Sequence, residues 1–277
     1  METPALMLLN DDKIDHLLQE VITHYGYDFW DYSRASLSRR IRRFMVQKQI
    51  STIGELEKRL LENEFFFELF VEELTVNVTE MYRDPTFYQA VKKIVIPKLA
   101  TYPSLKIWHA GCSTGEEVYS LAILLHEANL LERTVIYGTD INQKSLEQGR
   151  SGIFPLRYMD EYNQNYKESG GESDLKDYYK GQYSGALFHR FLRDKIIFSA
   201  HNLVSDQSFN EFNFIICRNV LIYFNKKLQN RVMKLFLNSL PVYGLLGLGS
   251  KESLTLSAYF QNFEPVVQEE RIFRRIL

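Results

Sequence analysis

The stretch that decides the fold is "LKIWHAGCSTGEEVYSLAILLHE", residues 105–127. It opens with a short apolar run, passes through a turn with two glycines, a serine and a threonine, and continues with the apolar spacing of a helix. In open parallel sheets, ligands bind beyond the carboxyl ends of the strands, and glycines in the first turn let backbone N–H groups approach them. Gly111 and Gly115 therefore predict a ligand-binding turn, with a tight strand-to-helix junction that binds nothing as the alternative.

The chain beyond this stretch repeats the alternation of strand and helix. Short apolar runs at "TVIYGTD", "KIIFSAHN" and "FNFIICRN" are separated by helical patterns such as "NQKSLEQGR", and "KKLQNRVMKLFLNSL" follows. Such alternation predicts an α/β class with a parallel sheet. Between residues 151 and 195 the pattern gives way to a tyrosine-rich polar stretch containing "ESGGESD", which predicts an insertion outside the sheet.

The region before residue 96 has helical spacing throughout. Apolar stripes run through "KIDHLLQEVITHYG", "SRASLSRRIRRFM" and "ENEFFFELFVEEL", and Thr52 with Glu55 forms a capping-box pattern. A last helix is expected in "DPTFYQAVKKIVIPKLA", with Asp84 at its cap and Pro85 at its first position. The sequence thus predicts an all-helical domain over residues 1–95 and an α/β domain over residues 96–277.

Composition excludes several classes of protein. The 277 residues are 45% hydrophobic and 25% charged, as in ordinary globular chains, and no apolar run approaches the roughly 18 residues of a spanning helix. Because the first residues lack a basic segment and a full apolar core, a cytoplasmic protein is expected. Cys112 and Cys217 have no ligand spacing around them, so neither a disulfide nor a metal site is expected. A net charge of −2 argues against indiscriminate binding of nucleic acid or membrane.

Three acidic residues narrow the class of cofactor. Asp140 ends a strand, where its carboxylate can accept hydrogen bonds from both hydroxyls of a ribose; capping a helix that starts near Gln143 is the alternative. No P-loop lysine follows the glycine turn, and Glu116 and Glu117 would repel a pyrophosphate placed there. The expected ligand is an adenosine without phosphates and with a cationic part, which describes S-adenosylmethionine (SAM).

Five stretches resemble, in order and spacing, the CheR-type chemoreceptor glutamate O-methyltransferases: "TVNVTEMYRDPTFY", "WHAGCSTGEEVYSLA", "GTDINQKSLEQGRSGIF", "FSAHNL" and "FNFIICRNVLIYF". The resemblance implies a Rossmann-like SAM-dependent methyltransferase domain after the helical domain, with a small antiparallel β subdomain inserted at residues 152–195. It implies methyl transfer from SAM to glutamate side chains of chemoreceptors in sensory adaptation, with S-adenosylhomocysteine as product. Two positions depart from the family: Met81 and Tyr82 replace paired aromatics, and "GSKE" at residues 249–252 replaces "GHSE".

The resemblance also implies the residues of the site. The cofactor positions are matched by Asn77, Thr79, Arg83, Gly111, Glu117, Asp140, Asn202, Leu203, Arg218 and Asn219. Arg83 and Tyr223 match catalytic positions, and the planar fork of an arginine suits a carboxylate. The alternatives are that Arg83 pairs with Asp84 and that Tyr223 is a core aromatic with a wet hydroxyl.

A basic helix predicts the partner. The arginines within "SRASLSRRIRRFM" have no acid among them: Arg34, Arg39, Arg40, Arg42 and Arg43. In the family the equivalent helix faces the acidic helical bundle of the receptor, which fits steering by complementary potentials. A solvated basic face is the alternative, and RNA a lesser one. A monomer that reaches the membrane only through its receptor is expected.

The reaction implied by the resemblance needs no general base. A substrate glutamate, with a pKa of about 4.3, is already an anion at neutral pH. His109 and His201 are therefore expected to make local hydrogen bonds. A SAM-binding regulatory module without catalysis is the alternative function. A nucleic-acid methyltransferase is disfavoured, because "NVLIY" lacks the prolines of the "[DN]PPY" pattern.

Overall fold

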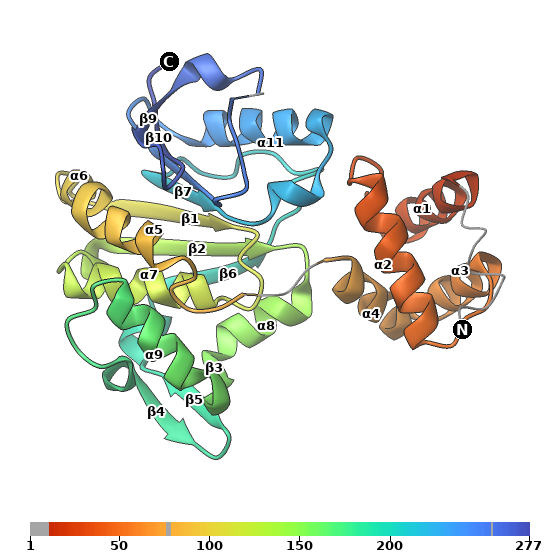
Figure 1. The fold of residues 1–277 in the computed structure, drawn as a ribbon, viewed down its shortest axis with the longest axis horizontal. Helices are drawn as coiled ribbons and strands as arrows, with labels where there is room; N and C mark the ends of the chain where they lie inside the picture. Colours follow the sequence, from red (N-terminus) through yellow and green to blue (C-terminus); the bar gives the residue numbers. More distant parts are fainter. Residues whose placement is uncertain (1–10, 76–78, 256) are drawn as a thin grey trace. The chain divides into compact units, whose positions relative to one another are not determined.

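The computed structural model describes residues 11–75, 79–255 and 257–277, which divide into two units (Figure 1). One unit comprises Met1–Val76 with Tyr223–Gln229, and the other comprises Asn77–Ile222 with Asn230–Leu277. The division falls earlier than the boundary at residue 95 that the sequence analysis expects. The reason is packing: Phe87, Val91 and Val95 share one core with strand and helix residues of the second unit.

The first unit is helical. Its helices are α1 (Asp11–Tyr25), α2 (Arg34–Gln47), α3 (Ile53–Glu62) and α4 (Glu64–Leu74). Their apolar stripes meet in a single buried cluster, as the helical spacing predicts. Thr52 Oγ1 accepts the Glu55 N–H at 3.2 Å, which confirms the predicted start of α3. The segment Tyr223–Gln229 joins this unit through a bridge between Tyr32 and Phe224 and through Asn225, whose N–H donates to Asp31 O at 2.9 Å.

The second unit is built on a seven-stranded sheet of order β6-β2-β1-β7-β8-β10-β9 (Figure 1). Its strands are β1 (Leu105–Ala110), β2 (Thr134–Asp140), β6 (Ile196–Ala200), β7 (Phe214–Cys217), β8 (Leu245–Leu248), β9 (Phe263–Val267) and β10 (Ile272–Arg275). Neighbours from β6 to β8 are parallel, and β10 is antiparallel to both β8 and β9. The predicted α/β class with a parallel sheet is confirmed, although the sequence analysis names no apolar run for the strands beyond β7.

Helices connect these strands. The longer ones are α7 (Glu116–Glu127), α8 (Gln143–Ser151) and α11 (Lys226–Ser239), and α5 (Pro85–Ala90), η2 (Val91–Val95) and α6 (Ile96–Leu99) follow one another without a break. Short turns of helix complete the list: η3 (Leu131–Arg133), η6 (Leu221–Tyr223) and η7 (Phe260–Asn262). No helix among the described residues is both long enough and apolar enough to span a bilayer.

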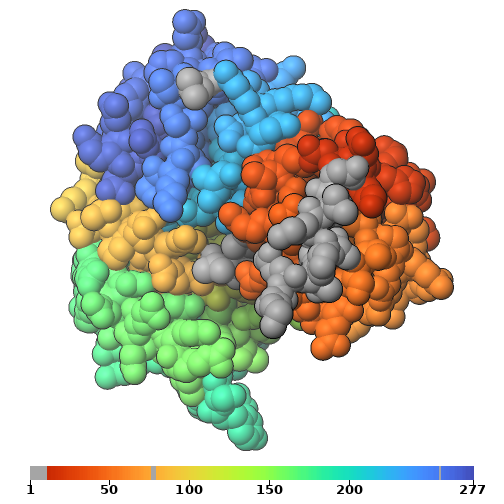
Figure 2. All heavy atoms as spheres, turned by 45° about the vertical axis from the view of Figure 1, so that its right-hand side comes forward, coloured from red at the N-terminus to blue at the C-terminus, as the bar shows by residue number. Residues whose placement is uncertain are grey.

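The predicted insertion is a small subdomain with its own sheet. Strands β3 (Ile153–Pro155), β5 (Gly185–Phe188) and β4 (Tyr179–Gln182) pair antiparallel in that order, which confirms the antiparallel sheet expected within residues 152–195. It also contains η4 (Leu156–Tyr158), α9 (Met159–Glu168), η5 (Leu175–Tyr178) and α10 (Arg190–Arg193). The β4–β5 hairpin projects from the surface in Figure 2, with Tyr183 97% exposed.

Candidate active site

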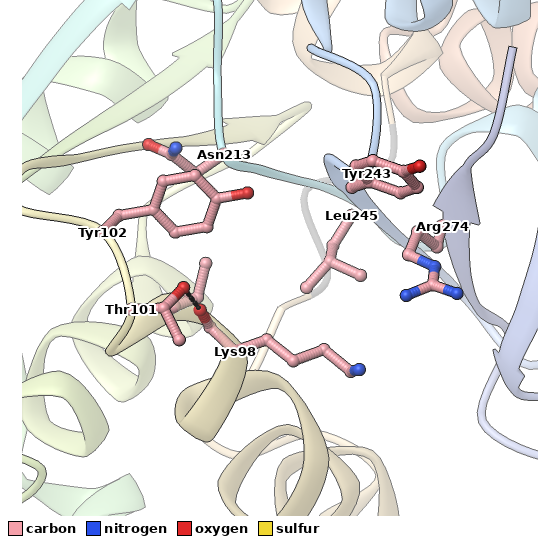
Figure 3. Close-up of a pocket in the computed structure, with 8 residues that line it drawn as sticks. Lys98, Thr101, Tyr102, Asn213, Tyr243, Leu245 and Arg274 are labelled. Atoms are coloured by element: carbon pink, nitrogen blue, oxygen red, sulfur yellow. Dashed lines mark hydrogen bonds between the residues drawn. The ribbon is translucent and has the colours of Figure 1, made fainter.

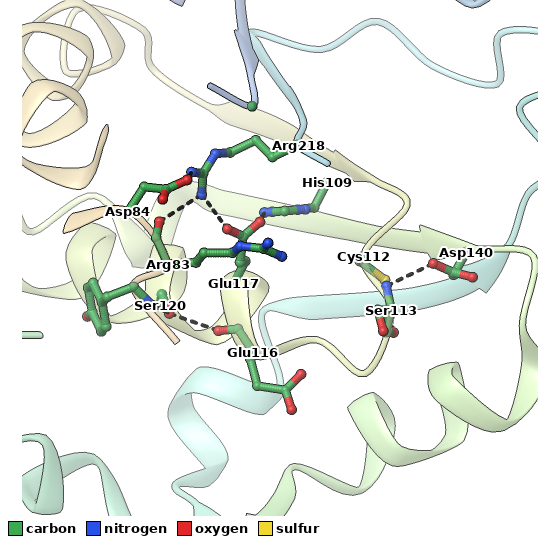
Figure 4. Close-up of polar contacts among 12 residues, drawn as sticks. Arg83, Asp84, His109, Cys112, Ser113, Glu116, Glu117, Ser120, Asp140 and Arg218 are labelled. Carbon is green, nitrogen blue, oxygen red and sulfur yellow. Dashed lines mark hydrogen bonds and ion pairs between the residues drawn. The ribbon is translucent and has the colours of Figure 1, made fainter. Parts of the chain in front are cut away.

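The glycine turn and the end of β2 lie together at the carboxyl edge of the sheet. The N–H groups of Gly111 and Cys112 both donate to Thr139 O, at 2.8 and 2.9 Å. Asp140 Oδ2 accepts the Ser113 N–H at 2.8 Å (Figure 4). The turn after β1 is therefore fastened to the acid after β2, as a nucleoside site at this edge requires.

Asp140 does not cap the helix that follows it. Asn142 is the N-cap of α8, and its Oδ1 accepts the Ser145 N–H at 3.1 Å. Asp140 Oδ1 accepts the Asn142 N–H at 2.9 Å, and burial raises the pKa of the carboxyl. The capping alternative is thus wrong, and the carboxylate organises the turn on which a ribose would lie.

Glycine is required at position 111 for two reasons. Its φ is +73°, in the left-handed region, and a Cβ built there would lie 2.4 Å from Val220 Cγ2. This close approach brings the loop after β7 against the glycine turn. Gly115, with φ +93°, is the N-cap of α7 in the same conformation.

The segment after β6 reaches the same edge. The His201 N–H donates to Asp140 O at 3.2 Å, so Asn202 and Leu203 follow directly beside the Asp140 backbone. Asn202 Oδ1 accepts the Val204 N–H at 2.9 Å, so the side-chain oxygen organises the turn after β6. His201 Nε2 lies 3.1 Å from Gln207 O, which confirms the local hydrogen bond expected of it.

Arg218 forms a buried knot of ionic contacts at the end of β7 (Figure 4). Its side chain is 1% exposed, and Nη1 donates to Glu117 Oε1 and, at 2.9 Å, to Arg83 O. Nη2 pairs with Asp84 Oδ2, and the guanidinium carbon lies 4.3 Å from the Phe87 ring centroid. These contacts hold Arg218 and Glu117 to each other, while Arg218 Nε is buried without a hydrogen-bond partner among the described residues. The cofactor roles of both residues stay predictions.

The knot fixes the predicted catalytic Arg83. The Arg83 carbonyl is one ligand of the Arg218 guanidinium, and the next residue, Asp84, is another. Asp84 is the N-cap of α5 without a side-chain capping bond, because its carboxylate is turned to Arg218. The arginine that the sequence analysis places at the cofactor is thus tied at its backbone to both α7 and β7.

Glu252, a residue the sequence analysis does not select, shapes the loop after β7. It is 3% exposed, and its carboxylate accepts the N–H groups of Val220 at 2.9 Å, Leu221 at 2.7 Å and Gly249 at 2.6 Å. Asn219, just before these donors, has φ +60°. The acid of "GSKE" therefore holds the Asn219 turn, while the changed residues of that element, Ser250 and Lys251, are exposed.

Burial sets the charge of two neighbouring groups. Burial raises the pKa of Glu116 to about 7. The hydrogen bond that Thr114 Oγ1 donates to the Glu116 carboxylate lowers this pKa, but by less than burial raises it. Burial, with the charge of Arg218, lowers the pKa of His109 to about 3. The His109 ring nitrogens have no hydrogen-bond partner in the part of the chain described, and Nε2 lies 3.7 Å from Glu117 Oε2. The expected local hydrogen bond of His109 is absent there, and its imidazole stays neutral.

Other predicted residues lie elsewhere. Asn77 falls outside the described residues, and Thr79 is half-buried in the second unit. Tyr223 belongs to the first unit, where its O accepts the Ser33 N–H at 2.7 Å and the Arg40 guanidinium lies 5.2 Å from its ring centroid. The contact with Arg40 supports the alternative in which the Tyr223 ring has a packing role.

The arginines of α2 differ in their surroundings. Arg34 pairs with Asp15, and Arg40 Nη1 donates to Glu73 O at 3.1 Å, so both are half-buried. The exposed ones are Arg39, Arg42 and Arg43. The basic surface expected of five arginines is carried mainly by these three.

A pocket of about 160 Å³ opens at the other edge of the sheet (Figure 3). Its walls come from residues before β1, β7 and β8 and from β10: Lys98, Leu99, Thr101, Tyr102, Asn213, Tyr243, Leu245 and Arg274. It contains no predicted site residue. The candidate site is accordingly defined by the contacts at the carboxyl edge and not by this pocket.

The carboxyl edge fits SAM. The left-handed Gly111 turn admits a close backbone approach, the Asp140 carboxylate is bonded to the same turn, and Asn202 follows His201, whose N–H donates to Asp140 O. No lysine follows the turn to bind a pyrophosphate. Bound SAM would supply a methyl group on a cationic sulfur.

Comparisons with known proteins agree with this geometry. A family model described as "CheR methyltransferase, SAM binding domain" matches residues 77–268, and one described as "CheR methyltransferase, all-alpha domain" matches residues 12–75. A Pseudomonas putida protein named as a methyltransferase, Cher3, is 48% identical over 96% of this chain and 97% of its own. The chemotaxis protein methyltransferase of Listeria innocua is 32% identical over 83% of this chain and 85% of its own. The chemotaxis protein methyltransferase of Salmonella typhimurium is 27% identical over 90% of this chain and 86% of its own. The chain belongs to the CheR methyltransferase family, and SAM is its cofactor.

Proposed function

We propose that this protein transfers the methyl group of SAM to glutamate side chains of chemoreceptors, forming methyl esters in chemotactic adaptation in the cytoplasm. Relatives named chemotaxis protein methyltransferases support the pathway. The observation that carries the proposal is the Arg218 knot, which holds Arg83 beside the carboxyl edge of the sheet. The planar fork of an arginine at this edge suits a carboxylate.

The chemistry needs alignment more than proton transfer. A glutamate carboxylate oxygen forms a bond to the methyl carbon while the carbon–sulfur bond breaks, and its electron pair returns to sulfur. No proton moves, because glutamate is an anion well above its pKa of about 4.3. His109 is a poor acceptor in any case, since burial lowers its pKa to about 3. The protein has to align the reactants and exclude water from an anion that approaches a cation.

We assign roles on this basis. Asp140 holds the ribose hydroxyls, Asn202 with the adjacent Leu203 backbone reads the adenine, and Arg83 orients a carboxylate. The Asn219 turn, held by Glu252, forms the wall opposite Gly111. Tyr223 remains a proposed catalytic residue from the family pattern.

The exposed arginines of α2 serve the encounter with the receptor. Arg39, Arg42 and Arg43 offer positive charge on one helix, and the receptor's helical bundle supplies acids in this proposal. Complementary potentials of this kind raise the rate of association more than the affinity.

Labelled methyl transfer to receptor-rich membranes tests the proposal. The wild type is expected to place label on receptors as base-labile esters, and replacing the modified glutamates by glutamine should abolish it. Arg83→Lys should lose at least about tenfold in rate at an unchanged melting temperature, since a point charge lacks the planar fork. Arg133→Lys is the control, because the Arg133 side chain is exposed and bonds Ala100 O. A wild type that binds SAM and labels no receptor would overturn the enzyme assignment; a fully active Arg83→Lys would remove Arg83 from the site.

A further inference from the structure

The backbone on both sides of Arg83 is in an unusual conformation. Tyr82 has φ +53° and Asp84 has φ +55°, both in the left-handed region although neither is glycine. Such residues persist only where the surrounding structure holds them. The Tyr82–Asp84 turn must therefore be fixed by its contacts.

One set of contacts comes from the methyltransferase sheet and α7 (Figure 4). The Tyr82 N–H donates to Ser120 Oγ at 2.9 Å, and Ser120 Oγ donates to Glu116 O at 2.8 Å. Arg218 binds the Arg83 carbonyl at 2.9 Å. These contacts fix the Tyr82 N–H, which belongs to the Met81–Tyr82 peptide, and the Arg83 carbonyl. The carbonyl of the Met81–Tyr82 peptide needs a donor of its own.

The inserted subdomain supplies the contact to Met81. Asn165 Nδ2 of α9 donates to Met81 O at 3.2 Å, across 84 residues of sequence. Met81 is fully buried, so its carbonyl depends on a protein donor. Asn165 thus holds the carbonyl of the peptide that leads into the left-handed turn, and Ser120 holds the N–H of the same peptide.

The same subdomain packs around the Tyr82 ring. The ring centroid of Tyr82 lies 5.3 Å from that of Tyr166 on α9 and 5.0 Å from that of Tyr88. The hydroxyls of Tyr166 and Tyr178 both donate to Glu127 Oε1 of α7, the second at 2.9 Å. Tyr82 Oη is buried and has no hydrogen-bond partner among the described residues, so packing alone orients its ring. The inserted subdomain, held to α7 through Glu127, thus packs against the Tyr82 side chain.

We propose that Asn165, supported by Tyr166, is a positioning residue for methyl transfer, acting through Met81 and Tyr82 on Arg83. This inference rests on the proposed role of Arg83. Losing the Asn165 donor leaves a buried carbonyl unpaired, and the left-handed Tyr82 relaxes toward ordinary backbone. Arg83 then shifts, and its fork no longer meets a carboxylate in line. The inserted subdomain thereby forms one wall of the catalytic turn.

The chain offers a matched control on the same helix. Asn163 is half-buried like Asn165, but its Oδ1 accepts the Leu175 N–H at 3.0 Å, a contact inside the subdomain. Asn163→Ala removes an equivalent hydrogen bond without touching Met81. If Asn165→Ala does not fold, Asn165→Leu keeps the approximate size of the side chain and removes the donor without adding a charge.

Hydrogen exchange and kinetics on the full chain test the proposal. Asn165→Ala should raise amide exchange over residues 80–84 and lower kcat by about fivefold, the factor that one ordinary hydrogen bond represents. Asn163→Ala should leave both unchanged. In an Arg83→Lys background Asn165→Ala should cost no further rate, because both changes act on one group.

The outcomes separate the two claims. Unchanged exchange over residues 80–84 in Asn165→Ala would overturn the anchoring of Met81, whatever the activity. Raised exchange with unchanged kcat, or full additivity with Arg83→Lys, would overturn the positioning role. A wild type without methyl transfer to receptors would defeat the proposed function, and the exchange data would still decide the anchoring.

Discussion

Arginines occupy two opposite environments in this molecule. The Arg218 side chain at the carboxyl edge is 1% exposed and binds Glu117, Asp84 and the Arg83 carbonyl. The Arg43 side chain on α2 is 67% exposed, and its Nε lies 3.3 Å from Glu73 Oε1. A buried charge has to be paired, and the pairing then fixes the geometry around it. An exposed charge is screened by water and salt and acts mainly through its long-range electrostatic potential. A buried, paired arginine suits the precise geometry of a catalytic site, and an exposed arginine suits the first association with a charged partner.

The largest effect is expected when the buried knot is broken. Arg218→Ala should lower the free energy of unfolding by about 3–5 kcal/mol, because Glu117 is left buried without its partner. Arg43→Ala is the control and should cost at most about 1 kcal/mol. Urea denaturation of the two variants measures the difference. Similar losses from both would erase the distinction between the regions.

A smaller, pH-dependent effect is expected from Glu116. Burial raises its pKa to about 7 from an ordinary 4.5, so the folded protein holds this proton more tightly than the unfolded chain. The contribution to stability is complete below about pH 4.5 and is lost as the pH rises to about 7, by up to about 3 kcal/mol. Glu116→Gln should remove that part of the pH dependence.

Denaturation at pH 5 and pH 8 checks this expectation. The wild type should lose more stability between the two than Glu116→Gln, and Glu147→Gln, at an exposed position of α8, should follow the wild type. Identical pH profiles for Glu116→Gln and the wild type would show that Glu116 does not hold its proton.

The smallest effect on stability is expected from the exposed region. Arg39→Glu with Arg43→Glu should change stability by at most about 1 kcal/mol and leave SAM affinity intact. Receptor methylation should slow at low salt and approach the wild-type rate at high salt, where charges are screened. Lys58→Glu with Arg59→Glu on α3 is the matched charge reversal. If both pairs of charge reversals slow receptor methylation equally, the arginines of α2 have no special role in binding the receptor.

Much of the fold follows from local pattern. The helical stripes of the first unit and the runs that became β1, β2, β6 and β7 are periodic in the sequence, and periodicity reports burial directly. The strands β8 and β10 were missed because the runs "LLGL" and "IFRR" show no alternation of polar and apolar residues and no helical pattern follows them. Helix α9 escaped because its polar, tyrosine-rich composition resembles a loop.

The site divides in the same way. Gly111 and Asp140 were predictable, because a glycine turn and an acid at strand ends carry their geometry in adjacent residues. The pairing of Arg218 with Glu117 joins residues 101 apart, and that of Asn165 with Met81 joins residues 84 apart. Nothing local in the sequence encodes such contacts, since they depend on how the insertion and the sheet fold back together. Glu252 escaped for the same reason, because its bonds to Val220 and Leu221 cross between two strand ends.

Calorimetric titration of S-adenosylhomocysteine into the wild type, Asp140→Asn and Asp140→Ala tests the cofactor edge most directly. The account predicts that Asp140→Ala weakens binding by about 1.5–3 kcal/mol for each charged hydrogen bond lost to the ribose. Asp140→Asn, which can still accept the Ser113 N–H, should lose less. Unchanged affinity in Asp140→Ala, with the melting temperature also unchanged, would contradict the placement of SAM at the carboxyl ends of β1 and β2.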